Sequence, residues 1–97
     1  MNLPTLRKQI DRIDRQLLRL LNRRVALALR VGRLKRRRGL PVFDSRREDA
    51  ILRHVARANR GPLSPTSIRK IFRTVLRQSR QLESSTTQTR IRHSSRE

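Results

Sequence analysis

The stretch IDRIDRQLLRLLNRRVALALRVGRLK, residues 10–35, decides the fold, because its apolar residues recur at the spacing of one helical face. On a helix, Ile10, Leu17 and Val31 fall with their apolar neighbours within about 100°, the usual width of a buried face. Two cations, Arg24 and Lys35, lie inside this apolar stripe. Because burying an unpaired charge is costly, these two residues need an explanation.

The helix predicted around this stretch is very long for so small a chain. It begins near Pro4, a residue favoured in a first helical turn, and ends near Arg38, where Gly39 and Pro41 stop it. Its span of roughly 35 residues corresponds to about 50 Å. The 97-residue chain has too few other residues to cover such a rod, so we expect a second subunit to lie against it.

Two shorter helices are predicted after the long one, at about 44–60 and 64–83. Asp44 is a good N-cap for the first of them, in competition with the capping-box pattern at 45–48. The second opens at Ser64-Pro65, a cap followed by a first-turn proline. The sequence therefore predicts an all-α protein with a three-helix protomer.

One domain is predicted over residues 1–83. From residue 84 the sequence reads SSTTQTRIRHSSRE, which is polar with one isolated isoleucine. Such a segment has too little apolar surface to fold onto a core. We therefore expect residues 84–97 to form a disordered tail.

The composition limits the kinds of function. The chain has 26 basic and 7 acidic residues, a formal net charge of +19, which favours an anionic partner. Aromatic residues make up 2%, too few for a base-stacking surface, so we do not expect nucleic acid as the main partner. The chain has no cysteine, no metal-ligand spacing and no apolar run of membrane-spanning length. We expect a cytoplasmic protein without a metal or a membrane partner.

Polar side chains also lie on the inward faces of the two shorter helices. Ser79 and Glu83 continue the apolar row of the last helix at spacings of three and four residues, and Arg47 and Glu48 each lie one turn before an apolar residue. All three helices thus place polar groups where apolar ones are expected. This convergence predicts a polar pocket inside a helical bundle.

The residue types of this pocket suit a small, compact dianion, because arginine matches carboxylates bidentately. Arg24 and Lys35 lie ~16 Å apart along the axis, so their extended side chains can converge on one ligand. Arg7 lies ~25 Å from Arg24 and most simply serves the pocket of a partner subunit. Since no nucleophile has an adjacent base, an enzyme of this kind would act by positioning and fixed electrostatics.

The segments LRKQIDRIDRQLLRLLNRR, VGRLKRRRGLPVFDSRRE and IFRTVLRQSRQLE resemble the all-helical class of chorismate mutases, from about Leu6 to Glu83. The matching positions are Arg7, Arg24, Gly32, Lys35, Pro41-Val42, Asp44, Arg47-Glu48, Ser79 and Glu83. The resemblance implies an intertwined homodimeric helical bundle in which Arg7 reaches the active site of the other subunit. It also implies that chorismate rearranges to prephenate, a step of aromatic amino acid biosynthesis that needs no cofactor.

The resemblance assigns roles to the cations. Arg7 from the partner and Arg24 would clamp the substrate carboxylates, and Lys35 would contact the ether oxygen and a carboxylate. Arg47 and Ser79 would support the ring carboxylate. The fixed charge of Lys35 is expected to contribute most, because one preorganised donor is worth about 3–4 kcal/mol.

The resemblance also assigns roles to the acidic residues. Glu48, with the backbone at Asp44, would hold the ring hydroxyl. Many bacterial members have glutamine at the position of Glu83, where the amide donates to the ether oxygen. Glu83 is expected to be catalytic, together with Arg24 and Lys35. Because an ionised carboxylate only accepts hydrogen bonds, Glu83 can donate to the ether oxygen only when it is protonated. Burial raises the pKa of such a group and a nearby lysine lowers it, and the sequence leaves this balance open.

Other functions stay open at this point. The same scaffold also hosts isochorismate-pyruvate lyase, whose substrate differs little. A regulatory subunit that binds chorismate or prephenate for another shikimate-pathway enzyme is a second alternative. Nucleic-acid binding by the basic tail and surface is a third, which a steep salt dependence would reveal.

Overall fold

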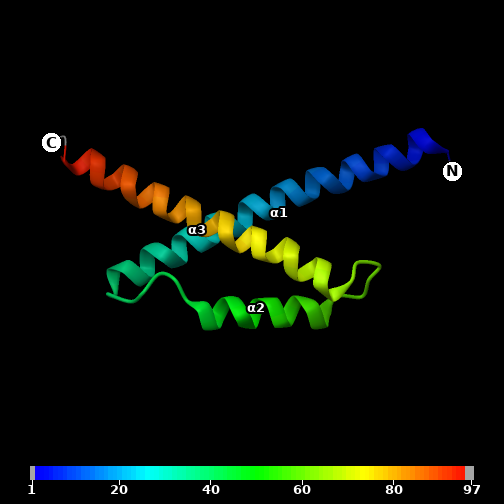
Figure 1. The fold of residues 1–97 in the computed structure, drawn as a ribbon. Coiled ribbons are helices and arrows are strands. Elements are labelled where there is room, and N and C mark those ends of the chain that lie inside the picture. Colours follow the sequence, from blue (N-terminus) through cyan, green and yellow to red (C-terminus); the bar gives the residue numbers. More distant parts are fainter. Residues whose placement is uncertain (1, 96–97) are drawn as a thin grey trace.

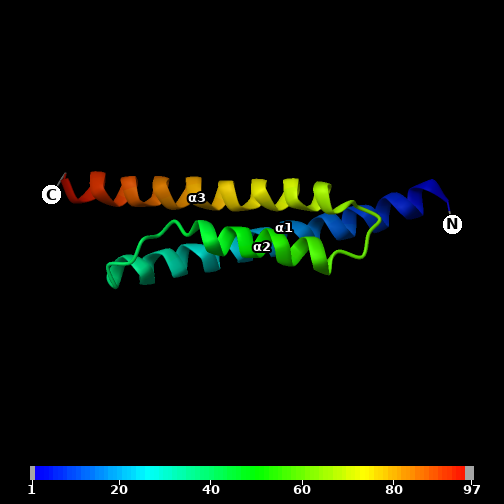
Figure 2. The same cartoon turned by 60° about the horizontal axis from the view of Figure 1, so that its bottom comes forward.

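The computed structural model describes the backbone of residues 2–95 and the side chains of residues 2–85. This part of the chain forms three helices, α1 (Leu3–Arg37), α2 (Ser45–Ala58) and α3 (Pro65–Ser95). α1 and α3 cross in Figure 1, and Figure 2 shows the same three helices from a second viewing direction. α2 packs against α3. The predicted all-α class with one very long N-terminal helix is confirmed.

The starts of α2 and α3 follow from their capping residues. The Asp44 side chain accepts a hydrogen bond from the backbone N–H of Arg47 at 3.0 Å, and the Ser64 hydroxyl accepts one from the N–H of Ser67 at 3.1 Å. An N-cap oxygen satisfies one of the backbone donors left unpaired at a helix start. Asp44 thus caps α2, which begins at Ser45.

α1 ends where the sequence predicts, whereas α3 continues beyond its predicted end. α1 ends at Arg37, and Gly39 has a φ of 69°, a backbone conformation that favours glycine. α3 continues to Ser95, whereas the sequence predicts an end near Glu83 and a disordered tail. No glycine or proline follows Pro65, so no residue forces α3 to stop.

The division into a domain over residues 1–83 and a separate tail stays a prediction. Within the tail, the backbone of residues 84–95 continues α3, while residues 96–97 lie outside the described part of the chain. None of the described helices is both long enough and apolar enough to cross a membrane.

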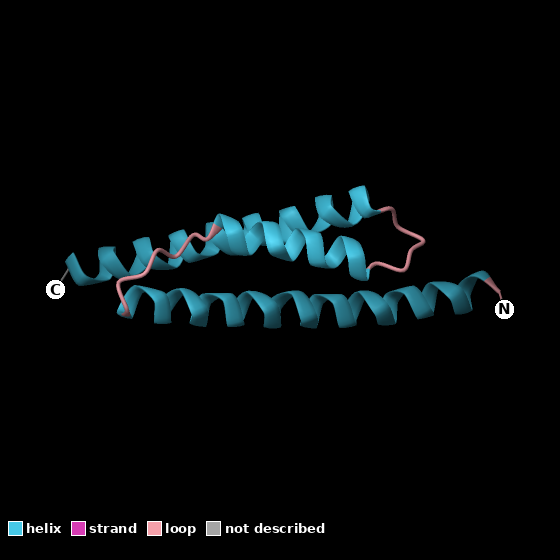
Figure 3. Cartoon of the chain, turned by 90° about the horizontal axis from the view of Figure 1, so that it is seen from below, coloured by secondary structure: helices cyan, strands magenta, loops and turns pink. Residues whose placement is uncertain are grey.

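The protomer is elongated and buries little. Its radius of gyration is 17.5 Å, compared with about 13 Å for a compact chain of about 100 residues. Among the described side chains, Leu76 (6% exposed) is the buried apolar one, while Ile10 is 56% and Leu17 50% exposed. Figure 3 shows α2 and α3 along one side of α1, and in Figure 1 the N-terminal half of α1 runs away from α3 beyond their crossing, where residues 3–23 are all exposed. The apolar stripe of α1 is therefore largely uncovered.

Candidate active site

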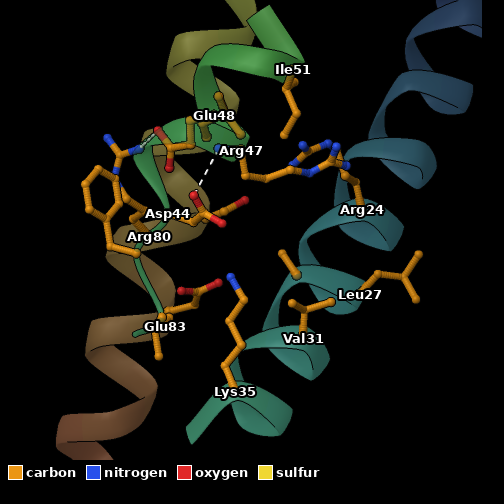
Figure 4. Close-up of a pocket in the computed structure, with 16 residues that line it drawn as sticks. Arg24, Leu27, Val31, Lys35, Asp44, Arg47, Glu48, Ile51, Arg80 and Glu83 are labelled. Carbon is orange, nitrogen blue, oxygen red and sulfur yellow. Dashed lines mark hydrogen bonds and ion pairs between the residues drawn. The ribbon is translucent and has the colours of Figure 1, made fainter. Parts of the chain in front are cut away.

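A pocket of about 310 Å³ lies where the C-terminal half of α1, the start of α2 and the middle of α3 meet (Figure 4). This volume is in the range of small-molecule sites. Seven of the eight site residues predicted from the sequence line it: Arg24, Lys35, Asp44, Arg47, Glu48, Ser79 and Glu83. Three helices that are separate in sequence thus bring these polar side chains together.

The wall from α1 explains the two cations in the apolar stripe. Arg24 and Lys35 are half-buried and turn toward the pocket from positions about three helical turns apart. Val31 lies between them and gives this wall an apolar section. Both positive charges therefore face a shared space in which an anion can be held.

The start of α2 forms a second wall. Asp44 and Arg47 are exposed in the protomer and lie at the edge of the pocket, tied together by the N-cap hydrogen bond. Glu48 is more enclosed, with its side chain 22% exposed. The backbone N–H of Glu48 donates to the carbonyl oxygen of Asp44 at 3.1 Å. The cap therefore fixes where the side chains of this first turn point.

The wall from α3 holds a buried hydroxyl without a partner. Ser79 is 5% exposed, and its Oγ has no hydrogen-bond partner among the described residues. A buried hydroxyl usually finds a partner, because leaving it unpaired costs about 1–3 kcal/mol. The Ser79 hydroxyl lines the pocket, so an anionic ligand there could accept its hydrogen bond.

Glu83 completes the same wall, opposite Lys35 (Figure 4). Burial raises the pKa of Glu83 above its ordinary value, and the nearby charge of Glu48 raises it further. The positive charges of Arg36, Lys35 and Arg80 lower this pKa, but burial outweighs them. Burial thus decides the balance that the sequence leaves open, and Glu83 stays protonated to a higher pH than an exposed glutamate does.

One predicted residue lies away from the pocket, and one residue that was not predicted lines it. Arg7 is exposed near the start of α1 and does not line the pocket of its own protomer. Arg80, which the sequence analysis did not select, does line it. A signal for Arg80 existed, because it lies four residues after Leu76 and three before Glu83, on the same helical face.

Comparison with known proteins agrees with this geometry. The family described as chorismate mutase type II matches residues 6–84. Chorismate mutase (Form II) from Thermus thermophilus has a similar structure, with a TM-score of 0.81 and 40% sequence identity. That match covers 84% of this chain and 92% of the Thermus chain. The likeness therefore extends over almost the whole of the Thermus chain.

Two longer relatives carry a similar segment. The bifunctional chorismate mutase/prephenate dehydratase of Aquifex aeolicus is 47% identical over 58 residues, which are 60% of this chain and 16% of that protein. The corresponding protein of Neisseria gonorrhoeae is 41% identical over 70 residues, 72% of this chain and 19% of that protein. The chain thus spans less than a fifth of the length of these two relatives.

Proposed function

Because the chain belongs to the type II chorismate mutase family, we propose that it isomerises chorismate to prephenate by a cofactor-free pericyclic rearrangement. The observation that carries this proposal is the convergence of Arg24, Lys35 and Arg47 with the unpaired Ser79 hydroxyl on one small pocket. Such a pocket suits a compact dianion with two carboxylates.

The rearrangement is unimolecular, so the site has two means of lowering its barrier. Arg24 and Lys35 bind carboxylates of the substrate and hold it in the folded conformer that reacts. Lys35 also places a fixed positive charge at the ether oxygen, where negative charge develops as the bond breaks. The first effect removes conformational freedom before the reaction, and the second acts mainly in the transition state.

Glu83 acts from the opposite side of the ether oxygen. In its protonated form it donates a hydrogen bond to that oxygen, as a glutamine amide does. The raised pKa of Glu83, caused mainly by burial, supports this role because it extends the pH range in which the donor is present. The ether oxygen of the breaking bond then lies between two hydrogen-bond donors, Lys35 and Glu83.

The ring end of the substrate contacts α2 and α3. Glu48 accepts a hydrogen bond from the ring hydroxyl, with the backbone at Asp44 beside it. The ring carboxylate accepts hydrogen bonds from Ser79 and, directly or through water, from Arg47. This assignment gives the buried Ser79 hydroxyl the partner that it lacks in the protomer.

The site is completed by a second copy of the chain. Residues 3–23 of α1 are all exposed, so their apolar side chains are not covered within the protomer. In an intertwined homodimer this stripe is covered, and Arg7 reaches the pocket of the other subunit to bind a substrate carboxylate. The elongated shape of the protomer supports this arrangement.

A spectroscopic assay tests the proposed activity. Purified protein is mixed with chorismate, the loss of chorismate absorbance is followed, and the product is identified as prephenate. Folded protein that leaves chorismate unchanged contradicts the proposal. In that case, conversion of isochorismate to salicylate would identify the lyase, and calorimetric binding of chorismate without turnover would identify a regulatory subunit. We further propose that the protein acts in aromatic amino acid biosynthesis, in the cytoplasm.

A further inference from the structure

Arg80 makes a contact between helices that the catalytic assignment above does not use. From α3, its Nη1 donates to Oε1 of Glu48 on α2, and the two side chains form an ion pair (Figure 4). The Arg80 guanidinium also lies over the ring of Phe43, 5.3 Å from the ring centroid. Two independent contacts thus hold this side chain beside the pocket that it lines.

We propose that Arg80 is a positioning residue, which holds one oxygen of Glu48 and leaves the other oxygen to accept the hydrogen bond of the substrate ring hydroxyl. The inference rests on the proposed function, because it requires a ligand with a hydroxyl at this place. A carboxylate without such a partner rotates among several orientations. The ion pair with Arg80 fixes one of them before the substrate arrives.

The charge of Arg80 matters as well as its geometry. A dianion that enters the pocket approaches the carboxyl groups of Asp44, Glu48 and Glu83. Unpaired negative charge there opposes the binding of another negative charge. Arg80 offsets the charge of Glu48 without occupying the place of the substrate carboxylates, which face Arg24 and Lys35. It therefore allows a carboxylate to serve as a hydroxyl acceptor in a site built for anions.

Kinetic analysis of Arg80→Gln tests this inference. Glutamine keeps a hydrogen-bond donor and removes the charge. We expect KM for chorismate to rise about tenfold while kcat falls less than about threefold, because the interaction exists in the ground state as well as in the transition state. Arg77→Gln is the matched control, since Arg77 lies one turn earlier on α3, is exposed and does not line the pocket. Its KM and kcat should stay at wild-type values.

A double-mutant cycle separates positioning from general stability. If Arg80 acts through Glu48, then adding Arg80→Gln to Glu48→Gln changes kcat/KM by less than about twofold. Arg80→Lys keeps the charge and should recover most of the affinity, provided that circular dichroism shows a folded protein. Additive losses, or an unchanged KM in Arg80→Gln, overturn the inference while leaving the proposed function intact. An inactive wild-type protein overturns both.

A second readout follows from the charges around Glu83. Lys35 and Arg36 on α1 and Arg80 on α3 lower its pKa, and Glu48 on α2 raises it. Removing the charge of Arg80 should therefore move the alkaline limb of kcat/KM to higher pH. A purely structural loss lowers activity at every pH and leaves that limb in place.

Discussion

Glu83 on α3 lies directly against Gly32 on α1. A methyl group on Gly32 would be 3.5 Å from the carboxyl carbon of Glu83, 3.6 Å from its Oε1 and 3.7 Å from Cγ1 of Val42. These are ordinary van der Waals distances, so the space at this position accepts one carbon and no more. Gly32 is the buried residue of α1, and its small size allows α3 to bring Glu83 to the pocket.

Gly32→Ala is expected to stabilise the protein. Glycine inside a helix is less favourable than alanine by about 0.5–1 kcal/mol, and the added methyl group meets no overlap. The midpoint of thermal unfolding should rise by a few degrees at fixed protein concentration. Gly32→Leu is the contrasting variant, because its side chain would displace Glu83 and lower kcat/KM strongly. A lower midpoint for Gly32→Ala would contradict the described packing.

The activity should depend on pH through Glu83. Because the protonated form is the donor, kcat/KM is highest below the pKa of Glu83 and falls as the pH rises through it. Burial raises this pKa, so the fall occurs at higher pH than for an exposed glutamate. Glu83→Gln, whose amide donates at every pH, should flatten the profile. A wild-type profile that is flat between about pH 5 and 9 would exclude this role.

The cations of the apolar stripe should be essential for turnover and not for folding. We expect Arg24→Ala and Lys35→Ala each to lower kcat/KM by at least about a hundredfold, because each removes a preorganised charge from the site. Circular dichroism should show an unchanged helix content. Arg23→Ala is a matched control, since Arg23 is the exposed neighbour of Arg24 and does not line the pocket. If Arg24→Ala or Lys35→Ala turned over chorismate at close to the wild-type rate, that residue would not belong to the active site.

The proposed contribution of Arg7 to the active site of the other subunit can be tested by mixing two inactive variants. In a mixed dimer of Arg7→Ala and Arg24→Ala, one site combines an intact Arg24 with an intact Arg7 from the other chain, and the second site lacks both. Random pairing after joint refolding should therefore recover about a quarter of wild-type activity. If Arg7 instead served its own protomer, every site would lack one arginine and mixing would recover nothing.

The local parts of the fold could be predicted from the sequence because they depend on local chemistry. Asp44 and Ser64 cap helices through their own side chains, and Gly39 ends one through its backbone freedom. α3 continues for about three turns beyond the end that its apolar residues predict, because a polar composition alone does not stop a helix. Polar residues without glycine or proline can continue a helix that has already begun.

The sequence could predict those site residues that lie on the apolar face of their own helix. The apolar rows of the three helices pointed to Arg24, Lys35 and Glu83, which meet at one pocket. The sequence could not show that Arg80 pairs with Glu48, because that contact depends on how α2 packs against α3. It also could not decide the pKa of Glu83, which depends on how far tertiary packing removes the carboxyl group from water. The catalytic roles of these residues stay predictions.

The exposed apolar residues of α1 affect how the stability and the activity of the protein are to be measured. A lone chain buries so little apolar surface that, in the proposed homodimer, most of the free energy that holds α1 beside α3 comes from the second chain. Folding and pairing are then one bimolecular event, and an unfolding midpoint has meaning only together with the protein concentration at which it was recorded. If the proposed homodimer forms, specific activity should decline on extreme dilution, because a separated chain lacks both the Arg7 of its partner and the surface that covers its own α1.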